Sequence, residues 1–147
     1  MFAFNPSPSG TGARKPNQQP PACLLVVEDE EQLRLLMTRT LTQDGYLTLS
    51  AADGIEGLAI LERESDRVDL VITDLVMPRL GGLGLYQAAR RQGMAVPMLF
   101  TSAGAHQDAQ TVLPPDGRLS FLRKPWTLEE LGRAIRWALE DGDPDEP

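Results

Sequence analysis

The sequence predicts an α/β fold in which a parallel sheet is covered by helices on both faces. Short apolar runs alternate with segments of helical periodicity through the middle of the chain. The runs CLLVV and VDLVIT are almost wholly apolar, as expected of strands buried on both faces. Strands that alternate with helices form parallel βαβ units with right-handed crossovers. In such sheets, sites form where the carboxyl ends of the strands meet.

The first half of the predicted domain contains three strands and two helices. The strands are expected at residues 23–27, 47–51 and 68–73. Apolar residues at helical spacing predict a helix over residues 31–44, closed by Gly45. Its expected inward side consists of Leu33, Leu36, Met37, Thr40 and Leu41. Asp53, with Glu56 three residues later, predicts the start of a second helix that continues through Leu61.

The second half adds two strands and two regular helices. The strands are expected at residues 96–101 and 119–122, and a third helix at residues 83–91. Thr127 and Glu130 form a capping box that opens the last helix. The residues that this helix is expected to turn inward are Leu128, Leu131, Ile135 and Leu139. Glycines and prolines in residues 102–118 predict that the fourth helix is short or irregular.

The two ends differ in composition from the domain predicted at residues 22–140. Residues 1–21 are rich in Pro, Ser, Gly, Asn and Gln, and residues 141–147 are acidic, so both are expected to be disordered. The formal net charge is -7, and no basic stripe is present to contact nucleic acid directly.

No apolar run approaches the roughly 20 residues that cross a bilayer. Residues 1–21 contain no charged start followed by an apolar stretch, so no signal peptide is expected. Its one cysteine, Cys23, is expected in the core, and one cysteine with one histidine argues against a zinc site. We therefore expect a cytoplasmic protein that binds no membrane.

Polar residues follow four of the five predicted strands. They are Glu28, Asp29 and Glu30 after the first strand, Asp74 after the third, Thr101 and Ser102 at the fourth, and Arg123, Lys124 and Pro125 after the fifth. Neighbouring carboxylates repel one another unless a cation intervenes, and hard oxygen ligands favour Mg²⁺. A lysine adds a fixed positive charge and a threonine can donate a hydrogen bond. This set predicts a cradle for a phosphoryl group on Asp74.

Four segments in order resemble the receiver domain of response regulators in two-component signalling. The segments are LLVVEDE, DLVITDLVMPRLGGLGL, PMLFTSAG and FLRKPWTLEEL, and the resemblance extends over residues 24–139. It implies a flavodoxin-like, doubly wound five-stranded sheet of order 2-1-3-4-5. It also implies a phosphoacceptor that takes a phosphoryl group from the phosphohistidine of a histidine kinase or a histidine phosphotransfer protein. Such a domain changes conformation to signal to a partner and is not an enzyme with a turned-over substrate.

The resemblance assigns roles to individual positions of this chain. Asp74 would be the phosphoacceptor. The Mg²⁺ ligands would be Glu28, Asp29, Asp74 and the backbone carbonyl of Val76. Around the phosphoryl group the resemblance implies a switch hydroxyl at Thr101 with Ser102 beside it, a phosphate-binding Lys124, a cis peptide bond before Pro125 and a switch aromatic at Phe121.

Some positions depart from the family pattern. Glu28 is one methylene longer than the usual aspartate, so its metal contact is expected to run through water. Phe121 has no hydroxyl and would act by packing alone. The segments PMLFTSAG and FLRKPWTLEEL, together with a shortened fourth helix, resemble receivers attached to hybrid histidine kinases more than those of transcription factors. The shortened helix leaves the oligomeric state open between monomer and weak dimer. Val76 and Ala103 offer no polar group to position water, so we expect slow loss of the phosphoryl group.

Two other classes of protein share features with such a phosphoacceptor. A pseudo-receiver would use the same fold for binding without phosphotransfer, but the acid, acceptor, hydroxyl and lysine set is intact. An aspartyl-phosphate hydrolase of the haloacid dehalogenase type shares an aspartate nucleophile, yet there the acceptor lies on the first strand and the acidic pair comes last. The sequence names neither the cognate kinase, nor the output, nor whether the domain stands alone.

Overall fold

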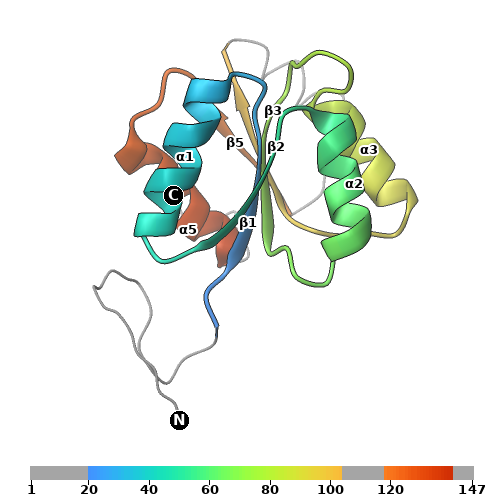
Figure 1. Ribbon diagram of the computed structural model, residues 1–147, viewed down its shortest axis with the longest axis horizontal. Helices are drawn as coiled ribbons and strands as arrows, with labels where there is room; N and C mark the ends of the chain where they lie inside the picture. The colour runs from blue at the N-terminus through green and yellow to red at the C-terminus, as the bar shows by residue number, and fades with distance from the viewer. Residues whose placement is uncertain (1–19, 104–117, 141–147) are drawn as a thin grey trace.

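The computed structural model describes residues 20–103 and 118–140, which form a sheet between two layers of helices (Figure 1). The strands are β1 (Cys23–Val27), β2 (Leu47–Ala51), β3 (Leu70–Asp74), β4 (Met98–Ser102) and β5 (Leu119–Arg123). The helices are α1 (Glu31–Gln43), α2 (Gly54–Glu64), α3 (Gly82–Arg91) and α5 (Leu128–Leu139). Helices α1 and α5 cover one face of the sheet, and α2 and α3 cover the other.

The sheet has the order β2-β1-β3-β4-β5, and all its neighbouring strands are parallel. The predicted fold class and strand order are therefore confirmed. The register pairs Asp74 at the end of β3 with Thr101 of β4. On the other side of β3, Thr73 pairs with Val27, the last residue of β1. The register thus brings the polar residues at these strand ends to one edge of the sheet.

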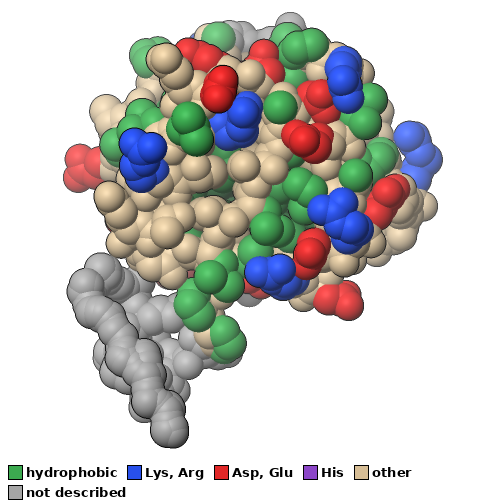
Figure 2. All heavy atoms as spheres, in the orientation of Figure 1, with side chains coloured by type: hydrophobic (Ala, Val, Ile, Leu, Met, Phe, Trp, Pro, Cys, Tyr) green, Lys and Arg blue, Asp and Glu red, His purple; other side chains and the backbone are tan. Residues whose placement is uncertain are grey.

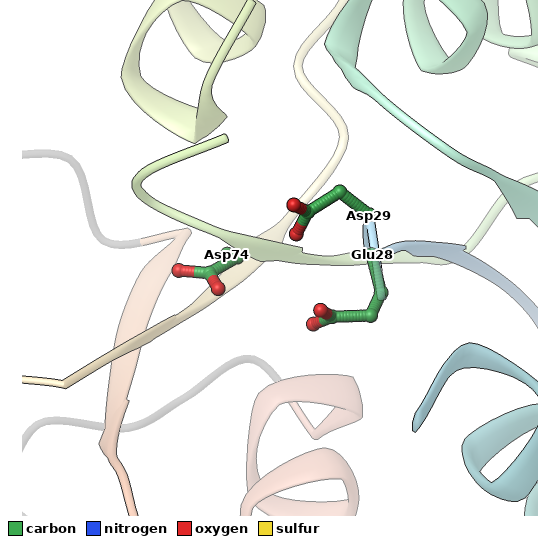
Figure 3. A group of neighbouring side chains, drawn as sticks. All are labelled: Glu28, Asp29 and Asp74. Atoms are coloured by element: carbon green, nitrogen blue, oxygen red, sulfur yellow. The ribbon is translucent and has the colours of Figure 1, made fainter. Parts of the chain in front are cut away.

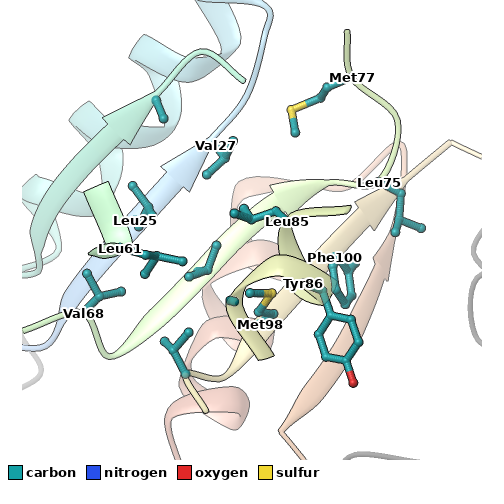
Figure 4. Packing of buried hydrophobic residues seen from close by; sticks show 14 residues of the cluster. Leu25, Val27, Leu61, Val68, Leu75, Met77, Leu85, Tyr86, Met98 and Phe100 are labelled. Carbon is teal, nitrogen blue, oxygen red and sulfur yellow. The ribbon is translucent and has the colours of Figure 1, made fainter. Parts of the chain in front are cut away.

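Two apolar clusters hold the helices to the sheet, one on each face. Alternate residues of a strand point to opposite faces. Leu25 and Val27 of β1 therefore pack on the face covered by α2 and α3, where Leu85 of α3 and Phe100 of β4 are fully buried (Figure 4). Leu24 and Val26 pack instead with α1 and α5. The buried members of that second cluster are Leu24, Val26, Met37, Leu41, Leu70, Ile72, Leu99, Leu131, Ile135 and Ala138.

Two predicted inward leucines are exposed. Leu36 of α1 is 47% exposed, while Met37 and Leu41 on the same helix are buried. Each residue turns a helix by about 100°, so Leu36 lies a quarter-turn away from Met37 and misses the sheet. Leu128 is 42% exposed. It is the first residue of α5, and helical side chains tilt toward the N-terminus, which takes Leu128 away from the packed turns.

Strands β3 and β4 each begin two residues later than predicted. The amide of Val68 donates to the carbonyl of Glu64 at 3.1 Å, so this residue finishes the end of α2 instead of starting the strand. The side chain of Asp69 then accepts from the amide of Cys23 at 2.8 Å. Before β4, the carbonyl of Val96 accepts from Arg90 Nη1 at 3.0 Å. The apolar residues at both starts are buried all the same, which is why periodicity alone extended the strands.

The predicted fourth helix and the predicted disordered ends lie outside the described residues, apart from Pro20, Pro21 and residues 102, 103 and 118 at the margins. Among the helices that the structure describes, none has the length and apolar character that crossing a membrane requires.

Candidate functional site

Three carboxylates meet at the carboxyl edge of the sheet. Glu28 and Asp29 follow β1, and Asp74 ends β3; one oxygen from each lies within 4.8 Å of the others (Figure 3). The three differ in exposure, because Glu28 is 3% exposed, Asp74 is half-buried and Asp29 faces solvent. The parallel register of β1 with β3 brings these side chains together although 45 residues separate Asp29 from Asp74 in sequence.

Lys124 supplies the positive charge beside these acids. It follows β5, and its Nζ lies 2.9 Å from Oδ2 of Asp74 and 3.9 Å from Oε1 of Glu28. The Lys124 side chain is 25% exposed and those of Asp74 and Glu28 are 13% and 4% exposed. Water therefore screens the pair less than it screens an ion pair at the surface.

Burial and charge shift the titration of two of these groups. Burial raises the pKa of Glu28 above its ordinary value; the hydrogen bond from the Glu30 amide and the charge of Lys124 oppose this rise, and Asp74 and Asp29 add to it. Burial by itself would lower the pKa of Lys124. The hydrogen bond and charge of Asp74, aided by Glu28 and Asp29, outweigh burial and leave the pKa of Lys124 raised. Lys124 is thus held as a cation, and Glu28 releases its proton less readily than a free glutamate.

The remaining predicted site residues border this group. Thr101 is 2% exposed and pairs with Asp74 in the register of β3 and β4. Ser102 follows it and is equally buried. Phe121 is half-buried in β5, with its ring centroid 5.4 Å from that of Phe100. The peptide bond between Lys124 and Pro125 is cis.

The loop after Asp74 is fixed at its base. The amide of Leu75 donates to the carbonyl of Thr101 at 3.0 Å, and the amide of Gly82 donates to the carbonyl of Leu75 at 3.0 Å. Val76 has a side chain turned to solvent, with 72% of the residue exposed. Its amide donates to Oδ1 of Asp74 at 3.3 Å. The two oxygens of Asp74 therefore face different groups, Val76 on one side and Lys124 on the other.

Sequence reasoning missed two contacts beside the site. Arg34 of α1 donates from Nη1 to the carbonyl of Glu28 at 2.8 Å. Arg79 of the loop after β3 pairs through Nε with Oδ2 of Asp53 at 3.0 Å. Helical spacing marks Arg34 only as a residue near the start of α1, and Asp53 was recognised only as a helix cap. No pattern in the sequence indicates which side chains meet across two loops.

The donor set of this edge suits a small divalent cation. Mg²⁺ prefers carboxylate and carbonyl oxygens at about 2.0–2.1 Å, and it usually keeps several waters. Two oxygens bound directly to one such ion are at most about 4.2 Å apart. The observed limit of 4.8 Å thus requires only a small side-chain adjustment or one bridging water. The acidic cluster of Glu28, Asp29 and Asp74 is consistent with a magnesium site.

Comparison with known proteins agrees with this geometry. A family model described as the response regulator receiver domain matches residues 24–136. The chain is 35% identical over 122 residues to the sensor kinase CckA of Brucella abortus, a match that covers 83% of this chain and 13% of that protein. It is 36% identical over 124 residues to the transcriptional regulatory protein GlrR of Escherichia coli, covering 84% of this chain and 28% of that protein.

Solved structures give the same result. A response regulator receiver domain protein from Clostridium thermocellum has a TM-score of 0.74 at 28% identity, covering 82% of this chain and 96% of that one. The receiver domain from the hybrid histidine kinase CckA has a TM-score of 0.68 at 32% identity, covering 80% and 99%.

The fold and the acidic edge thus define a phosphoacceptor signalling module. The chain belongs to the response regulator receiver domain family of two-component signalling. It is a receiver domain with the flavodoxin-like fold and not a classical enzyme, which removes the hydrolase alternative. A two-component receiver implies a histidine kinase as partner. The chain spans 13% of the length of CckA and 28% of the length of GlrR.

Proposed function

We propose that Asp74 accepts a phosphoryl group from the phosphohistidine of a histidine kinase or a histidine phosphotransfer protein. One observation carries this proposal: Asp74 alone of the three clustered carboxylates is contacted by Lys124 at hydrogen-bond distance while its other oxygen faces the loop. An acceptor carboxylate needs such a neighbouring cation, because phosphoryl transfer depends mainly on positioning and on neutralising charge.

The proposed reaction exchanges one bond to phosphorus for another. A carboxylate oxygen of Asp74 forms the new bond to phosphorus, and the bond from phosphorus to the histidine nitrogen breaks. The nitrogen keeps the electron pair and leaves as neutral imidazole after taking up a proton. Lys124 Nζ is close enough to neutralise negative charge first on the carboxylate and then on the phosphoryl oxygens.

The residues that would hold Mg²⁺ are Asp29, Asp74 and the backbone carbonyl of Val76, with Glu28 in contact through water. The ion, when bound, supplies positive charge to the phosphoryl oxygens. The buried Glu28 accepts the Glu30 amide at 3.2 Å, and this hydrogen bond supports an outer role for its carboxylate. Asp29 is exposed and has the freedom to turn toward an ion.

The proposed switch couples the phosphoryl group to β4 and β5. Thr101 lies beside Asp74 across the strand pair, so a small rotation would bring its hydroxyl to a phosphoryl oxygen. Phe121 then responds by packing alone, through its contact with Phe100. Phosphorylation would shift the population of a conformation that already exists.

The wider setting belongs to the same proposal. We place the domain at residues 22–140 in the cytoplasm, where the lone buried thiol of Cys23 stays reduced. Figure 2 supports a protein partner over nucleic acid, because acidic and basic side chains are interspersed on the face shown. We propose a monomer or weak dimer, and slow loss of the phosphoryl group because Val76 and Ala103 are exposed without a polar side chain to orient water.

The test is uptake of phosphate from radiolabelled acetyl phosphate with and without Mg²⁺. The wild-type chain should be labelled only with Mg²⁺, and Asp74→Asn should take up none. Asp66→Asn is the matched control, because Asp66 is an exposed aspartate in the turn after α2 and should label as the wild type does. Normal labelling of Asp74→Asn would refute the assignment, and an unlabelled wild type would leave only the pseudo-receiver.

A further inference from the structure

Asp53 makes two contacts at the start of α2. Its Oδ1 accepts the amide of Glu56 at 2.9 Å, which caps the helix. Its Oδ2 pairs with Nε of Arg79 at 3.0 Å, and the Asp53 side chain is only 13% exposed. The cap needs only one oxygen, so the second is free to hold a residue of another segment. That segment is the loop of residues 75–81, which follows the acceptor Asp74.

Arg79 has an unusual backbone for the residue type. Its φ is 74°, and it is the one non-glycine residue with a positive φ among the described residues. The left-handed region is unfavourable for a side chain with a Cβ, so such a residue persists only where its surroundings hold it. The ion pair with Asp53, in which the Arg79 side chain is 63% exposed, is one contact that holds Arg79 in this conformation.

A backbone contact lies directly beside this ion pair. The amide of Gly54 donates to the carbonyl of Leu80 at 2.9 Å, so the cap residue and the first residue of α2 hold two successive residues of the loop. A Cβ on Gly54 would meet that same carbonyl oxygen. The loop is closed at its base by Leu75 and Gly82 and is tied to α2 on its far side. Val76 lies in the stretch between these two attachments.

We propose that Asp53 and Arg79 are positioning residues that fix the loop and so hold in place the backbone of Val76, whose carbonyl would bind Mg²⁺ beside Asp74. Neither side chain is among the residues that would hold the ion; both act through the backbone of residues 76–80. This inference rests on the proposed function, because it concerns the same magnesium site. Without the ion pair the loop samples more conformations, and the entropy of ordering it then opposes metal binding.

Two variants separate this role from the helix cap. Asp53→Asn keeps an oxygen to cap Glu56 but turns an amide group toward Arg79. Arg79→Gly removes the ion pair and also relieves the positive φ, which glycine adopts freely. Arg79→Lys keeps a charge that can reach Asp53. Arg67→Gln is the matched control, because it breaks an exposed ion pair of 3.1 Å with Glu64 far along the chain from the site.

The measurement is the dissociation constant for Mg²⁺ alone, from titration of the amide resonances of Asp29 and Val76, together with the melting temperature of each metal-free variant. An ion pair with one largely exposed member is typically worth about a two- to five-fold change in an equilibrium constant. We expect roughly this loss for Asp53→Asn and Arg79→Gly, a smaller loss for Arg79→Lys and none for Arg67→Gln. The double variant that combines Asp53→Asn with Arg79→Gly should lose no more Mg²⁺ affinity than either single variant. Arg79→Gly should melt no lower than the wild type.

An unchanged Mg²⁺ affinity in Asp53→Asn and Arg79→Gly would overturn the inference. Additive losses in the double variant would do the same, because they would show that the two residues act separately. If the variants lose Mg²⁺ affinity only in proportion to a fall in melting temperature, both residues stabilise the fold and do not position the loop, which would also contradict the inference. Failure of the wild type to take up phosphate is a separate result, which counts against the proposed function and not against the measured role in metal binding.

Discussion

Glu28 is the residue whose environment departs most from that of an ordinary surface acid. It is almost fully buried beside two other carboxylates, and the Lys124 ammonium lies 3.9 Å from its Oε1. Burial of an acid without a close partner favours the protonated form. The folded chain therefore holds the Glu28 proton more tightly than the unfolded chain does, and this difference makes stability depend on pH.

We predict that the metal-free protein loses stability as pH rises above the ordinary Glu28 pKa of 4.5. The pKa of Glu28 is raised in the folded state, so the unfolded chain releases this proton at lower pH than the folded chain. Between the two pKa values, rising pH therefore stabilises the unfolded state relative to the folded state, and the free energy of unfolding falls. Glu28→Gln cannot titrate and lacks this decline. Urea unfolding of both proteins between about pH 4 and 7 measures the difference. An equal slope in both proteins would show that Glu28 titrates normally.

At the scale of the elements, the N-terminal caps of α2 and α5 agree with the prediction from the sequence. Asp53 and Thr127 each accept the amide three residues on, as the sequence indicated, because a cap depends only on neighbouring residues. The starts of β3 and β4 were predicted two residues too early, because buried apolar residues precede the point where pairing with the neighbouring strands begins. The prediction that Leu36 faces the sheet was wrong, because Leu36 lies about 100° around the helix from its buried neighbour Met37.

Gly54, the first residue of α2, is the helix position where we expect an added methyl group to destabilise the fold most. An added Cβ would meet the carbonyl oxygen of Leu80, the acceptor of the Gly54 amide. We predict that Gly54→Ala lowers the free energy of unfolding by about 1–3 kcal/mol, as overpacking does. Urea unfolding measures this change.

Gly132 provides the matched control for Gly54. It lies within α5, and a Cβ there would meet only Arg136 Nη1 at 3.5 Å. Alanine is favoured over glycine inside a helix, so Gly132→Ala should raise the free energy of unfolding by about 0.5–1 kcal/mol. Equal effects at both positions would contradict the close contact between α2 and the loop after β3.

At the scale of the whole molecule, the site exists only because distant segments end at one edge of the sheet. The sequence predicted this gathering, since parallel strands place their carboxyl ends together and the polar residues follow those ends. The contacts of Arg34 and of Asp53 with Arg79 were not predictable. The first depends on the turn between β1 and α1, and the second on how two irregular loops approach each other; no periodicity in the sequence encodes either contact.

Metal binding at this edge should stabilise the entire fold. A ligand that binds only the folded state adds about 2.7 kcal/mol to the free energy of unfolding at 100 times its dissociation constant. We predict a gain of this order on addition of Mg²⁺, and its loss on chelation with EDTA. Asp29→Asn should gain much less, because it removes a ligand. A similar gain in that variant would place the ion elsewhere on the molecule.

We propose one phosphoacceptor at the carboxyl edge of the sheet, and that acceptor is Asp74. The most direct measurement is to phosphorylate the chain with acetyl phosphate and Mg²⁺, reduce it with borohydride and sequence the peptides by mass spectrometry. Borohydride converts an aspartyl phosphate to homoserine, which marks the acceptor. We predict homoserine at position 74 alone, and none when Mg²⁺ is withheld. Homoserine at position 29 or at any other aspartate, with position 74 unchanged, would contradict the account.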